Sequence, residues 1–363
     1  MKANIAVLAG DGIGPEVIDQ ALKSLKTIEE CYGHEFRLEH ALIGAIAIDK
    51  TGNPFPDETK EICQKADAVL FGAIGDPKYD NDPKAKVRPE QGLLAMRKQL
   101  GLFANVRPVK SYEKLLHMSP LRPEKIAGAD FVVFRELTGG IYFGEPRGRS
   151  EDGNKAFDTC LYSKEEIVRI AKLAFRAAQA RQKRLTLVDK ANVLVTSRLW
   201  RETVNEVATE YPEITLDYMF VDNAAMQLIQ NPGRFDVVLT ENMFGDIITD
   251  EASVITGSLG MLPSASLGDK LSLFEPIHGS YPEVAGMNRA NPMAAILSLA
   301  MLLEHSLSLQ DEADAIRSAV DQCITEEILT EDLTSGKAYS TSEVGDAVAG
   351  FIREVATAGA KTP

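Results

Sequence analysis

The chain has 363 residues and is 45% hydrophobic, 25% charged and 7% aromatic, which is ordinary globular composition for one large or two moderate domains. Its net charge of -14 disfavours nucleic acid and acidic membranes as partners, and no apolar stretch approaches membrane-spanning length. The four cysteines are scattered without a CxxC pair, so we expect reduced thiols in a cytoplasmic protein: Cys31, Cys63, Cys160 and Cys323.

Short apolar segments alternate with helical segments along most of the chain. Six of them predict strands, at residues 5–10, 68–75, 131–137, 185–191, 216–222 and 235–241. Residues 163–182 begin with the pattern Ser-x-x-Glu and are apolar at helical spacing, which predicts an amphipathic helix, and residues 293–303 predict a buried one. The alternation indicates an α/β fold whose largely parallel sheet is covered on both faces.

A glycine-rich turn, LAGDGIGPE at residues 8–16, follows the first predicted strand. The dinucleotide fingerprint G-x-G-x-x-G requires a third glycine that lets the helix pack closely on its strand. Here the glycines are Gly10, Gly12 and Gly14, and Pro15 holds the position of the third. No acidic strand end is evident about twenty residues further on. The spacing therefore argues against a Rossmann fold and favours a tight strand-to-helix turn.

Arginines and leucines mark the next candidate site. A helix beginning at Pro89 places four side chains on one face: Glu90, Leu93, Leu94 and Arg97. That face suits either an amphipathic boundary or a ligand-binding wall. Arg107 lies in a proline-flanked segment, and Arg135 lies at the end of the strand at 131–137. Several converging guanidinium groups would bind a polycarboxylate, although a single arginine is more often a surface charge.

Charged residues also end two other predicted strands. Lys190 follows the apolar run LTLVD, and Asp222 closes the run DYMFVD. Ligands of open α/β sheets gather at the carboxyl ends of strands, so a lysine held there beside a carboxylate could transfer protons. The alternative is that strands simply end in charges. Tyr142 follows a Gly-Gly turn after the strand at 131–137, where packing is the more common role.

Two aspartates lie one helical turn apart in ENMFGDIITDEAS. Asp246 and Asp250 share a helix face at i, i+4 and repel one another unless a cation or base lies between them. Asp222 could complete a set of hard oxygen ligands, which favours Mg²⁺ or Mn²⁺. Further along, the polar turn-rich segment 273–292 contains His278 and Glu283 and suits either a surface loop or a loop wrapped around a nucleotide.

Together these motifs resemble the β-decarboxylating dehydrogenases, the family of isocitrate and 3-isopropylmalate dehydrogenases. The resemblance spans the chain and rests on GDGIGPE at 10–16, FGDIITDEASVITGSLGMLPSAS at 244–266 and EPIHGSYPEVAG…ANP at 275–292. It implies the family fold, a large mixed and mostly parallel sheet flanked by helices. It also implies a discontinuous cofactor-binding domain, 1–104 with 257–363, and a substrate and dimerisation domain, 105–256, whose arm projects at about 145–160.

The helix face at Glu90 is similar to that of the family members that act on isopropylmalate, whereas isocitrate enzymes carry Ser and Asn near Glu90 and Leu94. The resemblance implies that the isopropyl group meets Leu93, Leu94 and Val193, and that the carboxylates meet Arg97, Arg107 and Arg135. It further assigns Tyr142, Lys190 and Asp222 to proton transfer, and Asp222, Asp246 and Asp250 to Mg²⁺ or Mn²⁺. Isocitrate, homoisocitrate and tartrate remain alternative substrates.

The expected reaction is oxidative decarboxylation of 3-isopropylmalate to 4-methyl-2-oxopentanoate with reduction of NAD, a step of leucine biosynthesis. The resemblance places the cofactor against Ile13, Asn192, Glu275, His278, Gly279, Ser280, Tyr281, Glu283 and Asn291. The Glu283 carboxylate would accept from a 2′-hydroxyl and repel a 2′-phosphate, which favours NAD over NADP. Where most relatives carry Ala-Pro-Asp, this chain has Tyr281-Pro282-Glu283.

The resemblance also implies a homodimer in which Lys190 and Asp222 reach the active site of the neighbouring chain. A different class of function is a non-catalytic, nucleotide-binding subunit, as occurs in hetero-oligomeric members of the family. Such a subunit should have lost the tyrosine, the lysine or an aspartate of the metal cluster. All of these residues are present here, which disfavours that alternative.

Overall fold

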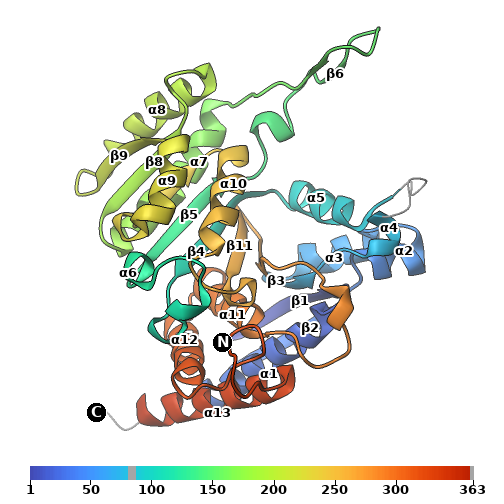
Figure 1. Ribbon diagram of the computed structural model, residues 1–363. Helices are drawn as coiled ribbons and strands as arrows, with labels where there is room; N and C mark the ends of the chain where they lie inside the picture. The colour runs from blue at the N-terminus through green and yellow to red at the C-terminus, as the bar shows by residue number, and fades with distance from the viewer. Residues whose placement is uncertain (81–86, 360–363) are drawn as a thin grey trace. The chain divides into compact units, whose positions relative to one another are not determined.

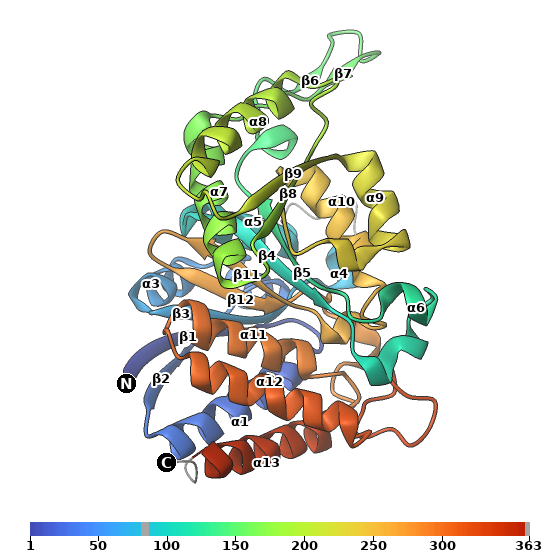
Figure 2. The ribbon, with the colours of Figure 1, turned by 90° about the vertical axis from the view of Figure 1, so that its left-hand side faces the viewer.

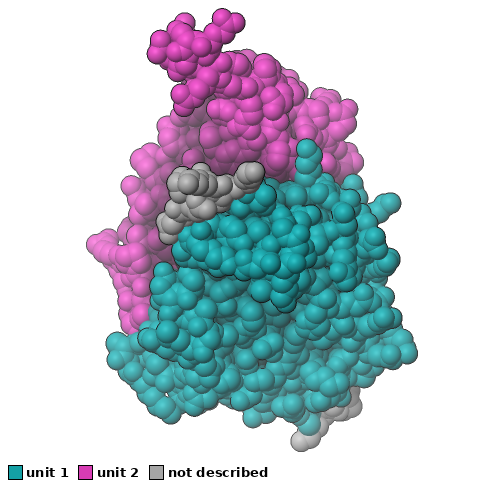
Figure 3. All heavy atoms as spheres, turned by 90° about the vertical axis from the view of Figure 1, so that its right-hand side faces the viewer, with its two compact units in different colours: residues 1–102, 257–363 teal, residues 103–256 magenta. Residues whose placement is uncertain are grey.

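The computed structural model describes residues 1–80 and 87–359. The chain divides into two compact units: unit 1 comprises Met1–Leu102 and Gly257–Pro363, and unit 2 comprises Phe103–Thr256. Figure 3 colours unit 1 teal and unit 2 magenta. The predicted domain 1–104 with 257–363 includes residues 81–86 and 360–363, which lie outside the described residues.

Unit 1 alternates strands and helices. In chain order its elements are β1 (Lys2–Gly10), α1 (Gly14–Tyr32), β2 (Glu35–His40), α2 (Ala45–Thr51), α3 (Asp57–Lys65), β3 (Ala68–Ala73), α4 (Pro77–Asp80), α5 (Pro89–Gln99), η4 (Leu259–Met261), β11 (Pro263–Gly268), β12 (Ser272–Pro276), η5 (Pro282–Val284), α11 (Met293–His305), α12 (Gln310–Thr325) and α13 (Thr341–Gly359). The η elements are short 3₁₀ helices.

The strands of unit 1 follow the order β2-β1-β3-β12-β11 (Figure 1). All neighbours are parallel except β11, which runs antiparallel to β12. Every residue of β3 is buried, as expected for a strand covered on both faces. The order differs from the Rossmann order 3-2-1-4-5-6, which confirms that the glycine-rich turn does not belong to that fold.

Helices cover the unit 1 sheet. Helix α1 packs against α11 and α13, and α12 lies between α11 and α13 (Figure 2). Helix α11 is buried from Met293 to Leu303, which confirms the buried helix predicted from its sequence. Helices α3 and α5 contribute Cys63 and Met96 to an apolar cluster with strand residues such as Phe71.

Unit 2 has the same alternation. Its elements are β4 (Leu102–Lys110), η1 (Glu113–Met118), α6 (Pro123–Ile126), β5 (Asp130–Glu136), η2 (Gly140–Tyr142), β6 (Gly148–Arg149), β7 (Ala156–Phe157), α7 (Lys164–Ala180), β8 (Arg184–Asp189), α8 (Val195–Ala208), β9 (Thr215–Phe220), α9 (Val221–Gln230), η3 (Pro232–Arg234), β10 (Val237–Thr240) and α10 (Asn242–Ser253).

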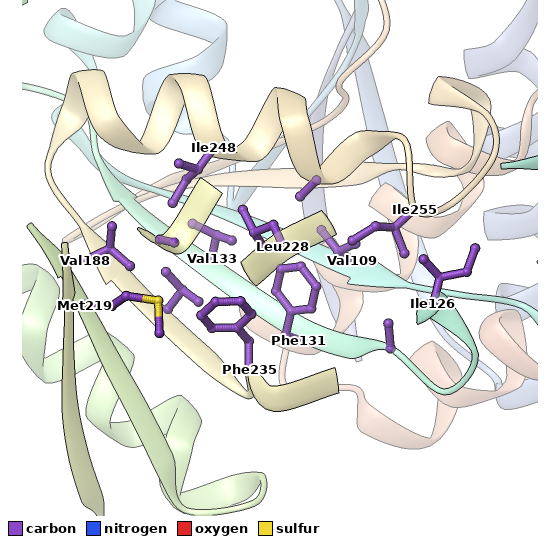
Figure 4. Packing of buried hydrophobic residues seen from close by; sticks show 14 of the residues in the cluster. Val109, Ile126, Phe131, Val133, Val188, Met219, Leu228, Phe235, Ile248 and Ile255 are labelled. Carbon is purple, nitrogen blue, oxygen red and sulfur yellow. The ribbon is translucent and has the colours of Figure 1, made fainter. Parts of the chain in front are cut away.

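The sheet of unit 2 has the order β4-β5-β10-β8-β9, with β4 antiparallel to β5 and the other neighbours parallel. Both units therefore contain the mixed, mostly parallel sheet that was predicted. Helices α9 and α10 pack against each other, and their apolar side chains join those of the strands in one cluster (Figure 4). In that cluster the rings of Phe131 and Phe235 lie 5.8 Å apart.

Local sequence signals explain two features of unit 2. Ser163 caps α7 by accepting from the Glu166 N–H, and the Glu166 side chain accepts from the Ser163 N–H, which confirms the predicted capping box. The polar segment predicted as an arm contains the small hairpin β6–β7, which extends away from the rest of unit 2 (Figures 1 and 2). All four cysteines are free thiols. None of the helices in residues 1–80 and 87–359 combines the length and the hydrophobicity of a membrane span.

Candidate active site

The carboxyl ends of the parallel strands of unit 2 position most of the predicted site residues. Arg135 is the second-last residue of β5, Lys190 directly follows β8, and α10 begins shortly after β10 ends. Because these strands are parallel, their carboxyl ends meet at one edge of the sheet, where ligands of open α/β sheets bind. The side chains form two groups.

The first group surrounds Asp246 on α10. Its carboxylate forms an ion pair with Arg135 Nη1 and accepts a hydrogen bond of 2.7 Å from the Tyr142 hydroxyl. The Arg135 guanidinium also lies over the Tyr142 ring, 6.0 Å from its centroid. A guanidinium, a phenol and a carboxylate thus meet at one point, and these are the groups predicted to bind a substrate carboxylate, donate a proton and hold a cation.

Asp250 lies one turn further along α10 and has its own arginine. Arg107 Nη1 donates to Asp250 Oδ1 at 3.1 Å and to Thr249 Oγ at 3.0 Å, while Arg107 Nε donates to Asn105 Oδ1 at 2.9 Å. The repulsion expected between Asp246 and Asp250 is therefore offset in this chain by two guanidinium groups. An anionic substrate would find two arginines already held at this edge of the sheet.

The Tyr142 phenol is protonated at neutral pH. Partial burial, followed by the hydrogen bond to ionised Asp246, raises the pKa of its phenol to about 12. Both causes disfavour the phenolate, because burial penalises the charged form and Asp246 accepts from the protonated hydroxyl. Sequence analysis recognised that Tyr142 follows the Gly139–Gly140 turn. It did not predict the contact of Tyr142 with Asp246.

The second group is an ion pair between Lys190 and Asp222, with Nζ and Oδ1 2.8 Å apart. The hydrogen bond from Lys190 holds the pKa of the Asp222 carboxyl below its usual range. Asp222 belongs to the first turn of α9, because β9 ends at Phe220, two residues earlier than the predicted strand. The neighbouring Asn192 and Val193 are exposed on the segment between β8 and α8.

The three predicted metal ligands do not converge within one chain. Asp246 and Asp250 share a face of α10, but the described residues contain no group of three His, Cys, Asp or Glu side chains placed to hold a metal ion. The donor chemistry nevertheless fits, because carboxylate oxygens are the ligands that Mg²⁺ and Mn²⁺ prefer.

In unit 1 the glycine-rich turn holds the predicted cofactor loop. The Ile13 N–H donates to the Ser280 carbonyl at 2.8 Å, and a Cβ at Gly12 would lie only 2.0 Å from that oxygen. The carboxylate of Glu16 accepts from the backbone N–H groups of Gly286 and Asn288. Hydrogen bonds from the GDGIGPE motif thus hold this loop in place. The side chain of Ile13 is buried.

The loop itself presents exposed and unsatisfied groups. His278 Nε2 is buried and has no hydrogen-bond partner among residues 1–80 and 87–359, and burial lowers the pKa of the imidazole. A neutral ring nitrogen of this kind fits a polar ligand such as a nucleotide. Tyr281 is exposed in the left-handed backbone region at φ 38, and Glu283 and Gly279 are exposed as well. Ser280 is buried against the glycine-rich turn.

Two of the predicted cofactor contacts have other partners in the structure. Glu275 Oε1 accepts from Arg97 Nη2 at 3.0 Å, so it is paired with a residue assigned to the substrate. Asn291 is buried; its Oδ1 accepts from the Met293 N–H at the start of α11, and its Nδ2 donates to Asp332 at 3.0 Å. Both residues therefore stabilise unit 1 whether or not they contact a cofactor.

Helix α5 begins at Pro89, as predicted, and carries the four residues of the predicted face. Glu90 and Leu94 are exposed, whereas Leu93 and Arg97 are half-buried. A Cβ at Gly75 would lie 3.2 Å from Glu90 Oε1 and 3.4 Å from Ser280 Oγ, so α5 and the loop are neighbours within unit 1. The predicted substrate helix and the predicted cofactor loop therefore share one side of this unit.

Sequence analysis missed two buried polar residues of these sites. Asn242 begins α10 and contacts Arg135, and Asp11 accepts backbone N–H groups from Ala45, Ile46 and Gly75. The signal for Asn242 was available, because residues 242, 246 and 250 follow one another at i, i+4 and i+8 on one helix face. No comparable spacing marks Asp11.

Comparisons with known proteins show the family to which the chain belongs. The model of the family described as isocitrate/isopropylmalate dehydrogenase matches residues 4–348. A 3-isopropylmalate dehydrogenase from Bacteroides fragilis is 56% identical and covers 98% of this chain and 100% of that protein. Another, from Geobacillus kaustophilus, is 57% identical and covers 94% of this chain and 93% of that protein.

Solved structures extend the agreement to the fold. Isocitrate dehydrogenase from Methylococcus capsulatus has a TM-score of 0.85 at 33% identity and covers 97% of this chain and 99% of its own. A β-decarboxylating dehydrogenase from Thermococcus kodakarensis has a TM-score of 0.83 at 36% identity and covers 99% of both chains. The chain belongs to the isocitrate and isopropylmalate dehydrogenase family.

Proposed function

We propose that the chain converts (2R,3S)-3-isopropylmalate to 4-methyl-2-oxopentanoate and carbon dioxide, with NAD as the hydride acceptor, as a step of leucine biosynthesis in the cytoplasm. The observation that carries the proposal is the contact of Arg135 and Tyr142 with Asp246. It combines carboxylate binding, a protonated phenol and a metal ligand, which are the elements that oxidative decarboxylation of a hydroxy diacid requires. The high identity to relatives named 3-isopropylmalate dehydrogenase supports the substrate.

The chemistry of each side chain indicates which part of the substrate it would bind. Arg97, Arg107 and Arg135 would bind the two carboxylates, and Leu93, Leu94 and Val193 would contact the isopropyl group. A charged substituent is disfavoured beside these leucines, because an unpaired carboxylate loses its hydration on apolar surface. Glu90 at the start of the same helix would further repel a third carboxylate.

Two proton transfers follow from the ionisable groups. Lys190 would relay the proton of the 2-hydroxyl group, passing one of its own protons to Asp222 while the hydride leaves C2. After the C3 carboxylate departs, Tyr142 would protonate C3 from its phenol. A Mg²⁺ or Mn²⁺ ion, held by Asp246, Asp250 and Asp222 of a second copy, would supply Lewis-acid stabilisation of negative charge on the C2 oxygen.

A homodimer would complete the site. Helix α9 exposes Met226 and Ile229 by 52% and 42%, and Ile247 of α10 and its C-cap residue Val254 are exposed by 58% and 37%, although the two helices pack against each other. Exposed apolar side chains on two helices that pack against each other suit the same pair of helices on a second copy, in a two-fold interface. The α9 helix also carries Asp222, so such an interface would bring this carboxylate close to α10 of the partner.

Substrate choice tests the proposal directly. We expect purified chain to reduce NAD fastest with 3-isopropylmalate, and at least about tenfold more slowly with isocitrate, homoisocitrate or tartrate, because each lacks the branched apolar group. The comparison of kcat/KM across these four acids measures it. Faster turnover of isocitrate than of 3-isopropylmalate would reject the assignment and favour the alternative.

Cofactor choice is a separate expectation. NAD should exceed NADP in kcat/KM by roughly tenfold or more, because exposed Glu283 would repel a 2′-phosphate. Glu283→Gln keeps the size of the side chain and removes its charge, so it should raise the relative use of NADP. Glu58→Gln, at the start of α3, is the matched control and should leave the ratio unchanged. Equal values for both cofactors in the natural chain would contradict the role of Glu283.

A further inference from the structure

We propose that Asn242 is a positioning residue that links the substrate-binding Arg135 to the turn that carries Tyr142. The inference rests on the proposed function and extends it to a side chain outside the predicted reacting set. Asn242 is the first residue of α10 and is buried. It lies one helical turn before Asp246, so it faces the same group of side chains.

The side-chain oxygen of Asn242 holds the guanidinium. Oδ1 accepts from Arg135 Nε at 3.1 Å and from Nη2 at 2.9 Å, while Nη1 of the same arginine pairs with Asp246. Because Nε and Nη2 share one acceptor, the plane of the guanidinium is fixed. The acceptor is neutral, so it orients Arg135 without cancelling the positive charge that a substrate carboxylate would meet.

The other side of Asn242 holds the turn. Nδ2 donates to the Gly139 carbonyl at 3.2 Å, and the backbone N–H donates to the Tyr162 hydroxyl at 3.0 Å. Tyr162 in turn packs against this turn, because a Cβ at Gly140 would lie 2.4 Å from its hydroxyl oxygen. Tyr142 ends the short 3₁₀ helix that begins at Gly140. One buried amide therefore fixes both the arginine and the start of the tyrosine segment.

The two halves of the amide can be separated by substitution. Asn242→Asp keeps an acceptor for Arg135 but removes the donor to Gly139 and adds a negative charge beside the guanidinium. Asn105 provides the matched control, since it is also buried and its Oδ1 accepts from Arg107 Nε at 2.9 Å. Asn105 belongs to β4, so Asn105→Asp changes the environment of a substrate arginine without altering a contact to the Gly139 carbonyl.

The test is a double-mutant cycle in kcat and KM. Asn242→Asp should lower kcat roughly tenfold, because the lost donor to Gly139 releases the turn. It should raise the KM for the diacid several-fold, because the added negative charge offsets the charge of Arg135 that a substrate carboxylate would meet. In a Tyr142→Phe background the kcat loss should largely disappear while the KM increase remains. Asn105→Asp should raise KM and leave kcat within about twofold. Equal kcat losses in both backgrounds would overturn the inference.

Folding and function are checked separately. Far-UV circular dichroism must match the natural chain, and Asn242→Ser, which loses both contacts, is the second variant. If neither variant folds, the role of Asn242 is structural and the inference is wrong. If the natural chain turns over no diacid, the proposed function fails. Crystal structures of the variants then test the role of Asn242 separately. The Tyr142–Asp246 hydrogen bond should be lost in Asn242→Asp but kept in Asn105→Asp, and its retention in both would contradict the link.

Discussion

Lys190→Met should abolish NADH formation while leaving the fold intact, with kcat lower by roughly 10²- to 10⁴-fold, the range for a positioned proton-transfer group. Lys190 Nζ lies 2.8 Å from Asp222, and its side chain is 26% exposed at the end of β8. Methionine has a similar length and no ionisable group, so it removes the proton acceptor with little change in packing. Steady-state kcat and the melting temperature are the two measurements.

Two further variants separate charge from proton transfer. Lys190→Arg keeps the positive charge beside Asp222 but remains protonated, so we expect it to stay nearly inactive. Lys164→Met, on the exposed side of α7, is the control and should keep full activity, because Lys164 pairs only with Glu206 among the described ion pairs. Full activity in Lys190→Met would overturn the proposed mechanism.

The same variant also tests whether sites are shared between two chains. Lys190→Met and Asp250→Asn should each be inactive alone. A hybrid dimer of the two would contain one site with both residues intact and one site with neither, so it should regain about half of the natural activity per dimer. Hybrids purified through two different affinity tags provide the sample. An inactive hybrid would show that each chain supplies its own lysine.

Tyr142→Phe should lower kcat by a similar factor, roughly 10²- to 10⁴-fold, because it removes the proposed donor to C3. KM should change much less, since Arg107 and Arg135 keep their positions through Asn105 and Asn242. The pKa of about 12 keeps the phenol protonated near neutral pH. We therefore expect no loss of rate from its ionisation below about pH 10.

Tyr218→Phe is the matched control for the loss of a phenol. Tyr218 lies on β9, where its hydroxyl donates to Asn205, so its loss should leave kcat unchanged. If Tyr142→Phe retained more than about a third of the natural kcat, a different group would have to protonate C3. The pH dependence of kcat in that variant would then show the pKa of the group that protonates C3 in place of Tyr142.

The strands that sequence patterns identified are those with continuous apolar runs. β1, β3, β5, β8 and β10 were expected because parallel strands covered on both faces need such runs, and β9 was expected from its apolar run although it lies at the edge of its sheet. β2 was missed because EFRLEH is mostly charged and lies at the edge of its sheet. β11 was missed because PSASLG contains small and polar residues, and β4 because Pro108 interrupts it. Burial of small side chains leaves no hydrophobic pattern to detect.

The site residues likewise fall into those that sequence patterns could place and those that they could not. Arg135 and Lys190 could be placed at strand ends from periodicity alone, and the α10 aspartates from their helical spacing. The pairing of Arg97 with Glu275 could not, since 178 residues separate the two side chains in the sequence. Asp11 was missed for a related reason, because a buried carboxylate takes its role from backbone groups that only the fold brings to it. Asn242 could have been found, because it shares its helix face with Asp246 and Asp250.

The central claim is metal-dependent, NAD-linked decarboxylation of 3-isopropylmalate by this chain. Absorbance of NADH at saturating 3-isopropylmalate, with and without EDTA, tests it in one measurement. We expect steady NADH formation with Mn²⁺ or Mg²⁺, loss of the signal in EDTA and recovery when excess Mn²⁺ is restored. Absence of NADH with the metal present, or turnover that persists in EDTA, would contradict the proposed function.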